Sequence, residues 1–201
     1  FDYLGAGGVV CKLAHPLLKA RPVEIFVRKD YLSLVAMATI SAIVPLVEEN
    51  RLLVRYGLKR MSHSRNAGIK ALMEVAQVKG PLTSADVGFR IGPRLNAAGS
   101  MDKPEDAPAM LMTQDAAEAQ KLADTLDAHN RARQAEEKRI HKDALSRLEA
   151  ECDPSEPVIV LGSRDWHPGV VGIVASRMMR RYHKPAFIIA IDEKGIGKGS
   201  G

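Results

Sequence analysis

The segment 89–100 reads Phe-Arg-Ile-Gly-Pro-Arg-Leu-Asn-Ala-Ala-Gly-Ser, and its polar side chains could bind a phosphate. Arg94 offers a planar guanidinium that can donate two parallel hydrogen bonds to a phosphate. Asn96 follows it among small residues. We expect Gly92-Pro93 to form a turn, and the small neighbours to leave Arg94 reachable from solvent. A plain surface loop fits this pattern equally well.

The segment 163–172, Ser-Arg-Asp-Trp-His-Pro-Gly-Val-Val-Gly, lies between a predicted strand and a predicted helix. Ligands of parallel sheets bind at the carboxyl ends of strands, and the amides of a helix N-terminus attract anions. His167 could hydrogen-bond or protonate a phosphate oxygen, and Trp166 could stack on a ligand or pack in the core. A purely structural histidine is the competing interpretation.

The segment 195–201, Gly-Ile-Gly-Lys-Gly-Ser-Gly, combines flexible backbone amides with Lys198 and Ser200. Such a combination can form a nest for phosphate. Taken alone, a glycine-rich hairpin turn is the favoured interpretation. A second glycine-rich stretch, residues 5–8, lacks the Gly-Lys-Ser/Thr ending of a P-loop. It is interpreted as a loop that enters a helix. Its glycines could let the backbone approach a phosphate, but tight helix packing is the favoured interpretation.

Helical patterns fill the chain before residue 152. They predict helices over 31–43, 50–58, 66–78 and 84–91, the last capped by Thr83 or Ser84, and a helix that starts within 101–112. The stretch 115–151 contains no proline or glycine and predicts one long helix. Its middle, residues 130–139, is polar nearly all round. This pattern is typical of a helix that crosses solvent between two domains.

The pattern changes after the proline-containing stretch 153–157. Residues 158–161 and 186–191 predict two buried strands, and residues 170–181 predict a helix between them. Strand, helix and strand over this length form a βαβ unit with a parallel sheet. The predicted fold class is therefore α/β, with a mostly helical first part (1–112), a long connecting helix (113–152) and the opening of a small α/β domain (153–201).

Composition excludes several classes of protein. The 201 residues carry 29 Lys and Arg against 24 Asp and Glu, a net charge of +5, which permits a polyanionic partner without requiring one. Neither Cys11 nor Cys152 has a partner at metal-ligand spacing, which excludes a zinc ribbon or finger, and two cysteines do not indicate a disulfide framework. A reducing cytoplasm is the expected compartment. No apolar run approaches the roughly 18 residues of a membrane span.

Taken in order, these segments resemble the RecJ family of single-stranded-DNA-specific 5′→3′ exonucleases, within the DHH phosphoesterase superfamily. The resemblance covers essentially the whole chain. It rests on residues 34–36, 39–40, 44–46, 49–51, 89–99, 166–175, 182–185 and 198–201. It implies the C-terminal part of a DHH domain over 1–112, a connecting helix, and the N-terminal part of a DHHA1 domain over 153–201. Single-stranded DNA would pass between the two domains.

The resemblance also implies hydrolysis by two metal ions, Mn²⁺ or Mg²⁺, which activate water and stabilise the leaving oxygen. Most metal ligands, including the Asp-His-His motif, are expected upstream of Phe1, so the chain is interpreted as a cut segment. One late aspartate ligand of the family corresponds to Ala42, whose methyl group cannot bind a hard cation. Ser33 replaces another aspartate and Ser100 an arginine. This chain alone is therefore expected to bind no metal and to be inactive.

Carried over by position, Arg94 and Asn96 would face the DNA cleft, while His167, Lys198 and Ser200 would meet phosphates from the other side. His167 is the one candidate catalytic residue. The implied context is DNA repair and recombination by a monomer without membrane contact, with a single-strand-binding protein or a helicase as candidate partners.

Two alternatives remain open at this point. The first is a catalytically silent relative that binds single strands or acts as a scaffold, as the RecJ-related subunit of the eukaryotic replicative helicase does. Ala42, Ser33 and Ser100 favour it. The second is a phosphodiesterase for oligonucleotides or cyclic dinucleotides, although the long charged helix fits a polymer better.

Overall fold

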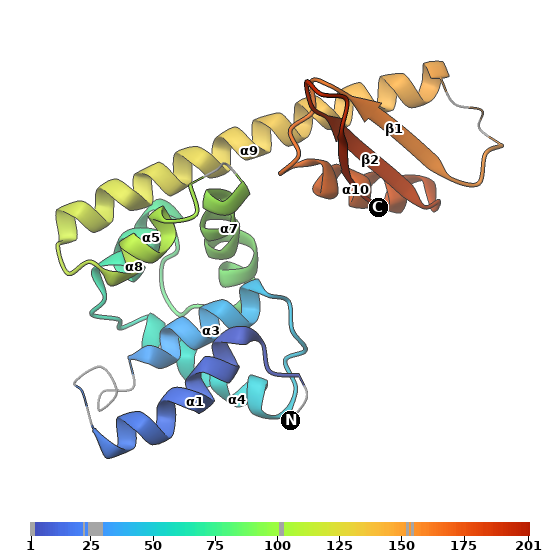
Figure 1. The fold of residues 1–201 in the computed structure, drawn as a ribbon. Coiled ribbons are helices and arrows are strands. Elements are labelled where there is room, and N and C mark those ends of the chain that lie inside the picture. The colour runs from blue at the N-terminus through green and yellow to red at the C-terminus, as the bar shows by residue number, and fades with distance from the viewer. Residues whose placement is uncertain (1–2, 22, 24–29, 101–102, 152, 154) are drawn as a thin grey trace. The chain divides into compact units, whose positions relative to one another are not determined.

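The structure, a computed structural model, describes residues 3–21, 23, 30–100, 103–151, 153 and 155–201, without the side chains of Ser100 and Glu151. Figure 1 shows a mostly helical chain with one small sheet, as the α/β prediction requires. The chain forms two compact units. Unit 1 comprises residues 1–99 and 103–128, and unit 2 comprises residues 100–102 and 129–201. The boundary falls within the long helix, which contributes to both units.

Unit 1 is helical throughout its described part. Its elements are α1 (Ala6–Ala20), α3 (Tyr31–Ser41), α4 (Glu48–Met61), α5 (Ala67–Val75), α6 (Ser84–Asp86), the π-helix η1 (Val87–Ile91), α7 (Gly92–Ser100), α8 (Asp106–Met112) and the first part of α9 (Ala116–Glu151). The helices predicted over 31–43, 50–58, 66–78 and 115–151 are therefore confirmed. Met101 and Asp102, where part of a helix start was expected, lie outside the described residues.

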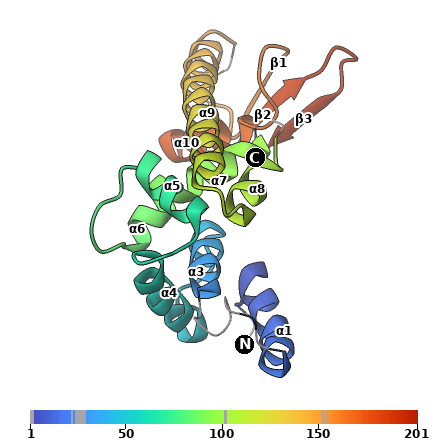
Figure 2. The same ribbon diagram turned by 90° about the vertical axis from the view of Figure 1, so that its left-hand side faces the viewer.

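In unit 1, α3 lies against α4 (Figure 2), and the apolar core extends from these helices to α9. Gly57 of α4 permits this approach, because a Cβ there would lie only 2.3 Å from the Leu32 carbonyl oxygen. The largest fully buried side chains of this core are Met61, Ile69, Leu72, Ile91, Met110 and Leu126. Since they come from successive helices, the packing of apolar faces holds the short helices in place.

Two N-caps fix where short helices begin. The Asn66 side chain accepts a hydrogen bond from the Ile69 amide at 2.9 Å and caps α5. Thr83, not Ser84, caps α6 in a capping box, in which the Thr83 hydroxyl accepts from the Asp86 amide and the Asp86 carboxylate accepts from the Thr83 amide. Each pair satisfies backbone donors that a helix start leaves unbonded.

The turn predicted at Gly92-Pro93 is wrong, because the helix continues through it. The wider π-helical turn of η1 lets the Gly92 amide donate to the Val87 carbonyl. Pro93 then occupies the first turn of α7, where a missing amide proton is tolerated. Gly92 also lets this turn approach α3, since a Cβ there would lie 2.8 Å from Ser41 Oγ.

The loop predicted over residues 5–8 is also wrong, because α1 begins at Ala6 and includes Gly7 and Gly8. The packing interpretation of these glycines is confirmed. A Cβ at Gly7 would lie 2.7 Å from the Cβ of Ala38 in α3, so the glycine lets the two helices approach closely.

Unit 2 contains the remainder of α9, β1 (Ile159–Ser163), α10 (Val171–Tyr182), β2 (Ala186–Ile191) and β3 (Gly197–Ser200). β1 and β2 are parallel, with Ile159 opposite Ala186, which confirms the βαβ prediction. β3 pairs antiparallel with β2, and the strand order is β1-β2-β3. The hairpin interpretation of the glycine-rich segment 195–201 is thereby confirmed.

One face of the sheet in unit 2 carries the core. Ile159, Leu161 and Ile188 are buried with residues of α9 and α10. The predicted burial of the strands holds for this face, whereas Val160 is 54% and Phe187 46% exposed on the other face. Within the part of the chain that the structure describes, no helix is long and apolar enough to span a bilayer.

Candidate functional site

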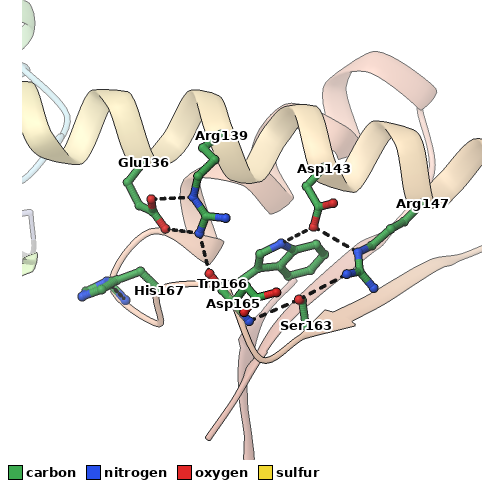
Figure 3. Close-up of polar contacts among 9 residues, drawn as sticks. Glu136, Arg139, Asp143, Arg147, Ser163, Asp165, Trp166 and His167 are labelled. Atoms are coloured by element: carbon green, nitrogen blue, oxygen red, sulfur yellow. Dashed lines mark hydrogen bonds and ion pairs between the residues drawn. The ribbon is translucent and has the colours of Figure 1, made fainter.

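The β1–α10 loop, residues 164–170, places His167 just ahead of the N-terminus of α10. The His167 carbonyl accepts hydrogen bonds from the amides of Val170 and Val171 at 3.0 and 3.3 Å. Its ring Nδ1 accepts from the Gly169 amide at 3.1 Å. In the neutral ring the proton therefore resides on Nε2, which is left to donate to a ligand. The ring is half-buried and points away from Trp166 (Figure 3).

The first turn of α10 adds backbone donors beside this loop. The amides of Ile173 and Val174 bond to the Val170 carbonyl, at 3.0 and 3.4 Å. The Gly172 amide has no hydrogen-bond partner among the described residues. The N-terminus of a 12-residue helix carries a partial positive charge, and together with the Gly172 amide this charge favours an anion.

β3 brings Ser200 to the same helix turn. A Cβ at Gly172 would lie 3.3 Å from Ser200 Oγ, so the hydroxyl is adjacent to the first turn of α10. Ser200 lies opposite Ile188 and Lys198 opposite Ala190, and both partners are buried on the core face. Opposed residues of an antiparallel pair share a face, so Lys198 also lies on the side of the sheet that α10 covers. Two segments predicted separately thus meet in unit 2.

Helix α9 holds the β1–α10 loop at Asp165 and Trp166 (Figure 3). Arg139 donates to the Asp165 carbonyl and to both oxygens of Glu136, at 2.7 and 2.8 Å. These hydrogen bonds, with smaller contributions from the charges of Arg139 and His167, hold the pKa of Glu136 below its usual range despite partial burial. Trp166 is only 3% exposed, so it packs in the core and does not stack on a ligand.

Arg94 lies in unit 1 on helix α7, not on a loop. Its Nε donates to Asp127 at 2.9 Å, and its two terminal nitrogens donate to the carbonyls of Arg90 and Val75 at 2.5 and 3.3 Å. Only 17% of its side chain is exposed. The protein itself therefore supplies acceptors for this guanidinium, which was expected to be reachable from solvent. Asn96 is exposed on the same helix.

Ala42 is the C-cap of α3 and presents an exposed methyl group at the position of the expected ligand. Among the described residues, no group of three or more His, Cys, Asp or Glu could hold a metal ion. Ser33 is buried, and its hydroxyl has no hydrogen-bond partner within the described structure. The residues that the structure describes therefore do not fit the metal centre implied by the resemblance.

Known proteins resemble the chain over most or all of its length. It is 39% identical over 202 residues, or 100% of the chain, to the single-stranded-DNA-specific exonuclease RecJ of Bacillus subtilis. It is 40% identical over 177 residues, or 86% of the chain, to that of Escherichia coli. The chain is a RecJ-like segment. It spans 25% and 31% of the length of these two proteins. No family model matches it.

Solved structures agree with this RecJ assignment. A crystal structure of RecJ from Thermus thermophilus in complex with Mg²⁺ has a TM-score of 0.73 at 39% identity, covering 80% of this chain and 25% of that one. A structure of exonuclease RecJ bound to manganese has a TM-score of 0.72 over 80% of this chain and 40% of that one. The mixed α/β fold of the RecJ-like segment is thereby confirmed.

Sequence reasoning missed the polar residues of α9 in this RecJ-like segment. The polar middle was expected to cross solvent, but Asn130 and Glu137 are only 3% and 4% exposed. Glu137 forms ion pairs with Arg133 at 3.1 Å and with Arg177 of α10 at 2.6 Å. Arg133 and Glu137 are four residues apart, a spacing that indicates an ion pair on one face of a helix. The sequence could not show that α10 supplies a second arginine to Glu137.

Proposed function

We propose that the chain is part of a RecJ-like exonuclease that hydrolyses single-stranded DNA from the 5′ end. The observation that carries the proposal is 39% identity along the whole chain to a protein named for this activity. In this proposal residues 1–112 belong to a DHH domain, residues 113–152 form the connecting helix, and residues 153–201 belong to a DHHA1 domain. Single-stranded DNA is the substrate, and the longer protein uses Mn²⁺ or Mg²⁺, the ions held by related structures.

The part assigned to this segment is recognition of a backbone phosphate in unit 2. His167 would donate from Nε2, the Gly172 amide would donate from the helix N-terminus, and Ser200 would donate its hydroxyl. Lys198 would add positive charge from the same face of the sheet. None of these groups reads a base, so binding should show weak sequence preference and a strong salt dependence.

A binding experiment tests this assignment. The 201-residue chain is titrated into a fluorescent, 5′-phosphorylated oligothymidylate at several salt concentrations, and anisotropy is measured. We expect His167→Ala and Ser200→Ala to weaken binding about tenfold each, the loss of one charge-assisted hydrogen bond. Lys198→Ala should also reduce the salt slope by about 0.7, the value for one phosphate contact on a single strand.

The matched control is Lys194→Ala, which removes an exposed lysine from the neighbouring β2–β3 turn. It should leave the salt slope unchanged, because the residue is outside the proposed site. Equal binding by wild type and all three site variants would remove unit 2 from the DNA path. A double-stranded oligonucleotide, expected to bind more weakly, tests the preference for single strands.

A catalytically silent relative is the second candidate, and Ala42 favours it. The test is Ala42→Asp in the longer protein that contains this chain, assayed with Mn²⁺ on a 5′-phosphorylated single strand. An increase over wild type and over the Ala42→Ser control supports an exonuclease impaired at this ligand position. Absence of hydrolysis by all three proteins, with single-strand binding retained, supports the silent relative.

A further inference from the structure

We propose that α9 positions His167 for phosphate binding through a clamp that is centred on the Asp143–Trp166 hydrogen bond. The clamp consists of Asp143 and Arg147 on α9, and Ser163 and Trp166 on β1 and the β1–α10 loop. The phosphate part of this proposal rests on the proposed function of unit 2, whereas the positioning part rests on the contacts alone. Asp143 and Trp166 are positioning residues, since neither is proposed to touch the ligand.

The hydrogen bonds of the clamp converge on one oxygen of Asp143 (Figure 3). The indole Nε1 of Trp166 donates to Asp143 Oδ2 at 2.8 Å, and Arg147 Nε donates to the same oxygen at 3.0 Å. The Arg147 guanidinium lies over the indole, 5.7 Å from the ring centroid, in cation–π geometry. Two residues of α9 therefore contact both the edge and the face of one aromatic ring.

The clamp extends to the end of β1 through Ser163. The Ser163 hydroxyl accepts from the Asp165 amide at 3.3 Å and lies 3.4 Å from an Arg147 nitrogen. Arg139 adds a second attachment through the Asp165 carbonyl. Successive residues 165 and 166 are thus both tied to α9, and the next residue in the chain is His167.

The burial of Trp166 restricts the orientations that its ring can adopt. Trp166 is 3% exposed, and a buried indole N–H without an acceptor costs on the order of a full hydrogen bond. Asp143 is therefore the residue that selects the orientation of the ring. The Trp166 backbone continues directly into His167, whose carbonyl and Nδ1 both bond within the turn leading to α10, so a Trp166 held by Asp143 also anchors the start of this turn.

The alternative is that Trp166 is only an apolar plug of the unit 2 core. The two interpretations differ in what they require of Asp143. A plug needs the volume of the ring but no particular acceptor, so removing the carboxylate should leave the loop unchanged. A clamp needs the acceptor but not its charge, so Asn, which retains an acceptor oxygen, should restore what Ala loses.

The experiment compares Asp143→Ala and Asp143→Asn with wild type in two measurements. The first is backbone amide hydrogen exchange of residues 167 and 169–171, since Pro168 has no amide proton, measured well below the unfolding transition. The second is binding of the 5′-phosphorylated oligothymidylate, followed by anisotropy and by the emission of Trp166, the only tryptophan. The control is Glu149→Ala, which removes an exposed carboxylate from the same helix.

We expect Asp143→Ala to increase exchange in the loop and to weaken binding about tenfold, with a shift in Trp166 emission. Asp143→Asn should restore both measurements to within about threefold of wild type, and the control should match wild type. Trp166→Phe, which keeps an aromatic ring but removes the donor, should reproduce the faster exchange. This rescue pattern would not arise from a general loss of stability.

Two outcomes overturn the clamp. If Asp143→Ala leaves loop exchange and binding unchanged, the indole is a plug. If Asp143→Asn fails to restore loop exchange and binding when both are measured well below its own unfolding transition, the charge of Asp143 acts, and not its acceptor oxygen. Failure of the proposed function has a different signature, namely no binding by wild type and no effect of His167→Ala, and the exchange measurement then still decides whether the clamp exists.

Discussion

Arg94 illustrates how its surroundings decide the role of a single side chain. An arginine side chain can bind phosphate, and the small residues near Arg94 in the sequence suggested that solvent could reach it. In the structure its nitrogens donate to one carboxylate and two backbone carbonyls of unit 1. Asp127, its carboxylate partner, is only 16% exposed. The local contacts therefore support a structural role in joining α5, α7 and the start of α9.

We predict that Arg94→Ala lowers the free energy of unfolding by about 2 kcal/mol, because it leaves a largely buried carboxylate without this donor. Urea denaturation measures the change, and Arg60→Ala on the exposed surface of α4 is the control. Unchanged stability, combined with a DNA-binding salt slope reduced by about 0.7, would show instead that Arg94 contacts a phosphate.

At the scale of elements, glycines set how closely the helices of unit 1 approach. Gly57 has the Leu32 carbonyl oxygen and the Ala36 methyl group within 2.4 Å of the place that a Cβ would occupy. Both belong to α3, the helix that carries Ala42 at its end. Gly99 of α7 has no atom of the described residues within 4 Å of that place. The space at Gly57 therefore excludes a side chain, whereas the space at Gly99 accepts one.

We predict that Gly57→Ala destabilises unit 1 by about 3 kcal/mol, since α3 and α4 must separate to admit a methyl group. Gly99→Ala should cause no loss, and even a gain of up to about 1 kcal/mol, because alanine favours helix. Thermal unfolding followed by circular dichroism measures both. Equal melting temperatures for the two variants would contradict this account of the α3–α4 contact.

The prediction of secondary structure succeeded where local pattern decides the element. The long helix has no breaker over 36 residues, and the βαβ unit shows two apolar runs around an amphipathic helix. It failed at Gly92-Pro93, where local chemistry favours a turn. There a π-helical turn and the contact with Ser41 of α3 allow the helix to continue. Neither is visible in the sequence around Pro93.

For the molecule as a whole, acid should act on unit 2 through its bound carboxylates. Hydrogen bonds from Arg139 lower the pKa of Glu136 from its ordinary value of 4.5. For Asp143, burial raises the pKa, but hydrogen bonds from Trp166 and Arg147 outweigh it, so the net change from 3.8 is downward. A group with a lowered folded pKa contributes stability above its unfolded pKa and loses it as the pH falls through the folded value.

We therefore predict that unit 2 begins to lose stability as the pH falls below about 6.5, because burial lowers the pKa of His141 in the folded chain. The loss should become steeper below about pH 4.5, where Glu136 and Asp143 are protonated. Urea unfolding followed by Trp166 emission measures it, because the only tryptophan lies in unit 2. The double variant Glu136→Gln, Asp143→Asn should have a lower free energy of unfolding at pH 7. Below pH 4.5 its free energy of unfolding should change less steeply with pH. The exposed control Glu149→Gln should follow wild type, and an equally steep acid loss in the double variant would contradict the assignment.

The sequence by itself determined the helices, the βαβ unit and the resemblance to RecJ, because periodicity, breakers and ordered motifs are properties of neighbouring residues. It also identified His167 and Ser200 as candidates, but could not show that β3 brings Ser200 beside Gly172 at the start of α10. Only the tertiary structure assigned Arg94 to internal acceptors and Trp166 to Asp143. The physical reason is that a hydrogen bond between residues 23 or 33 positions apart depends on how the elements pack, and no local pattern encodes that packing.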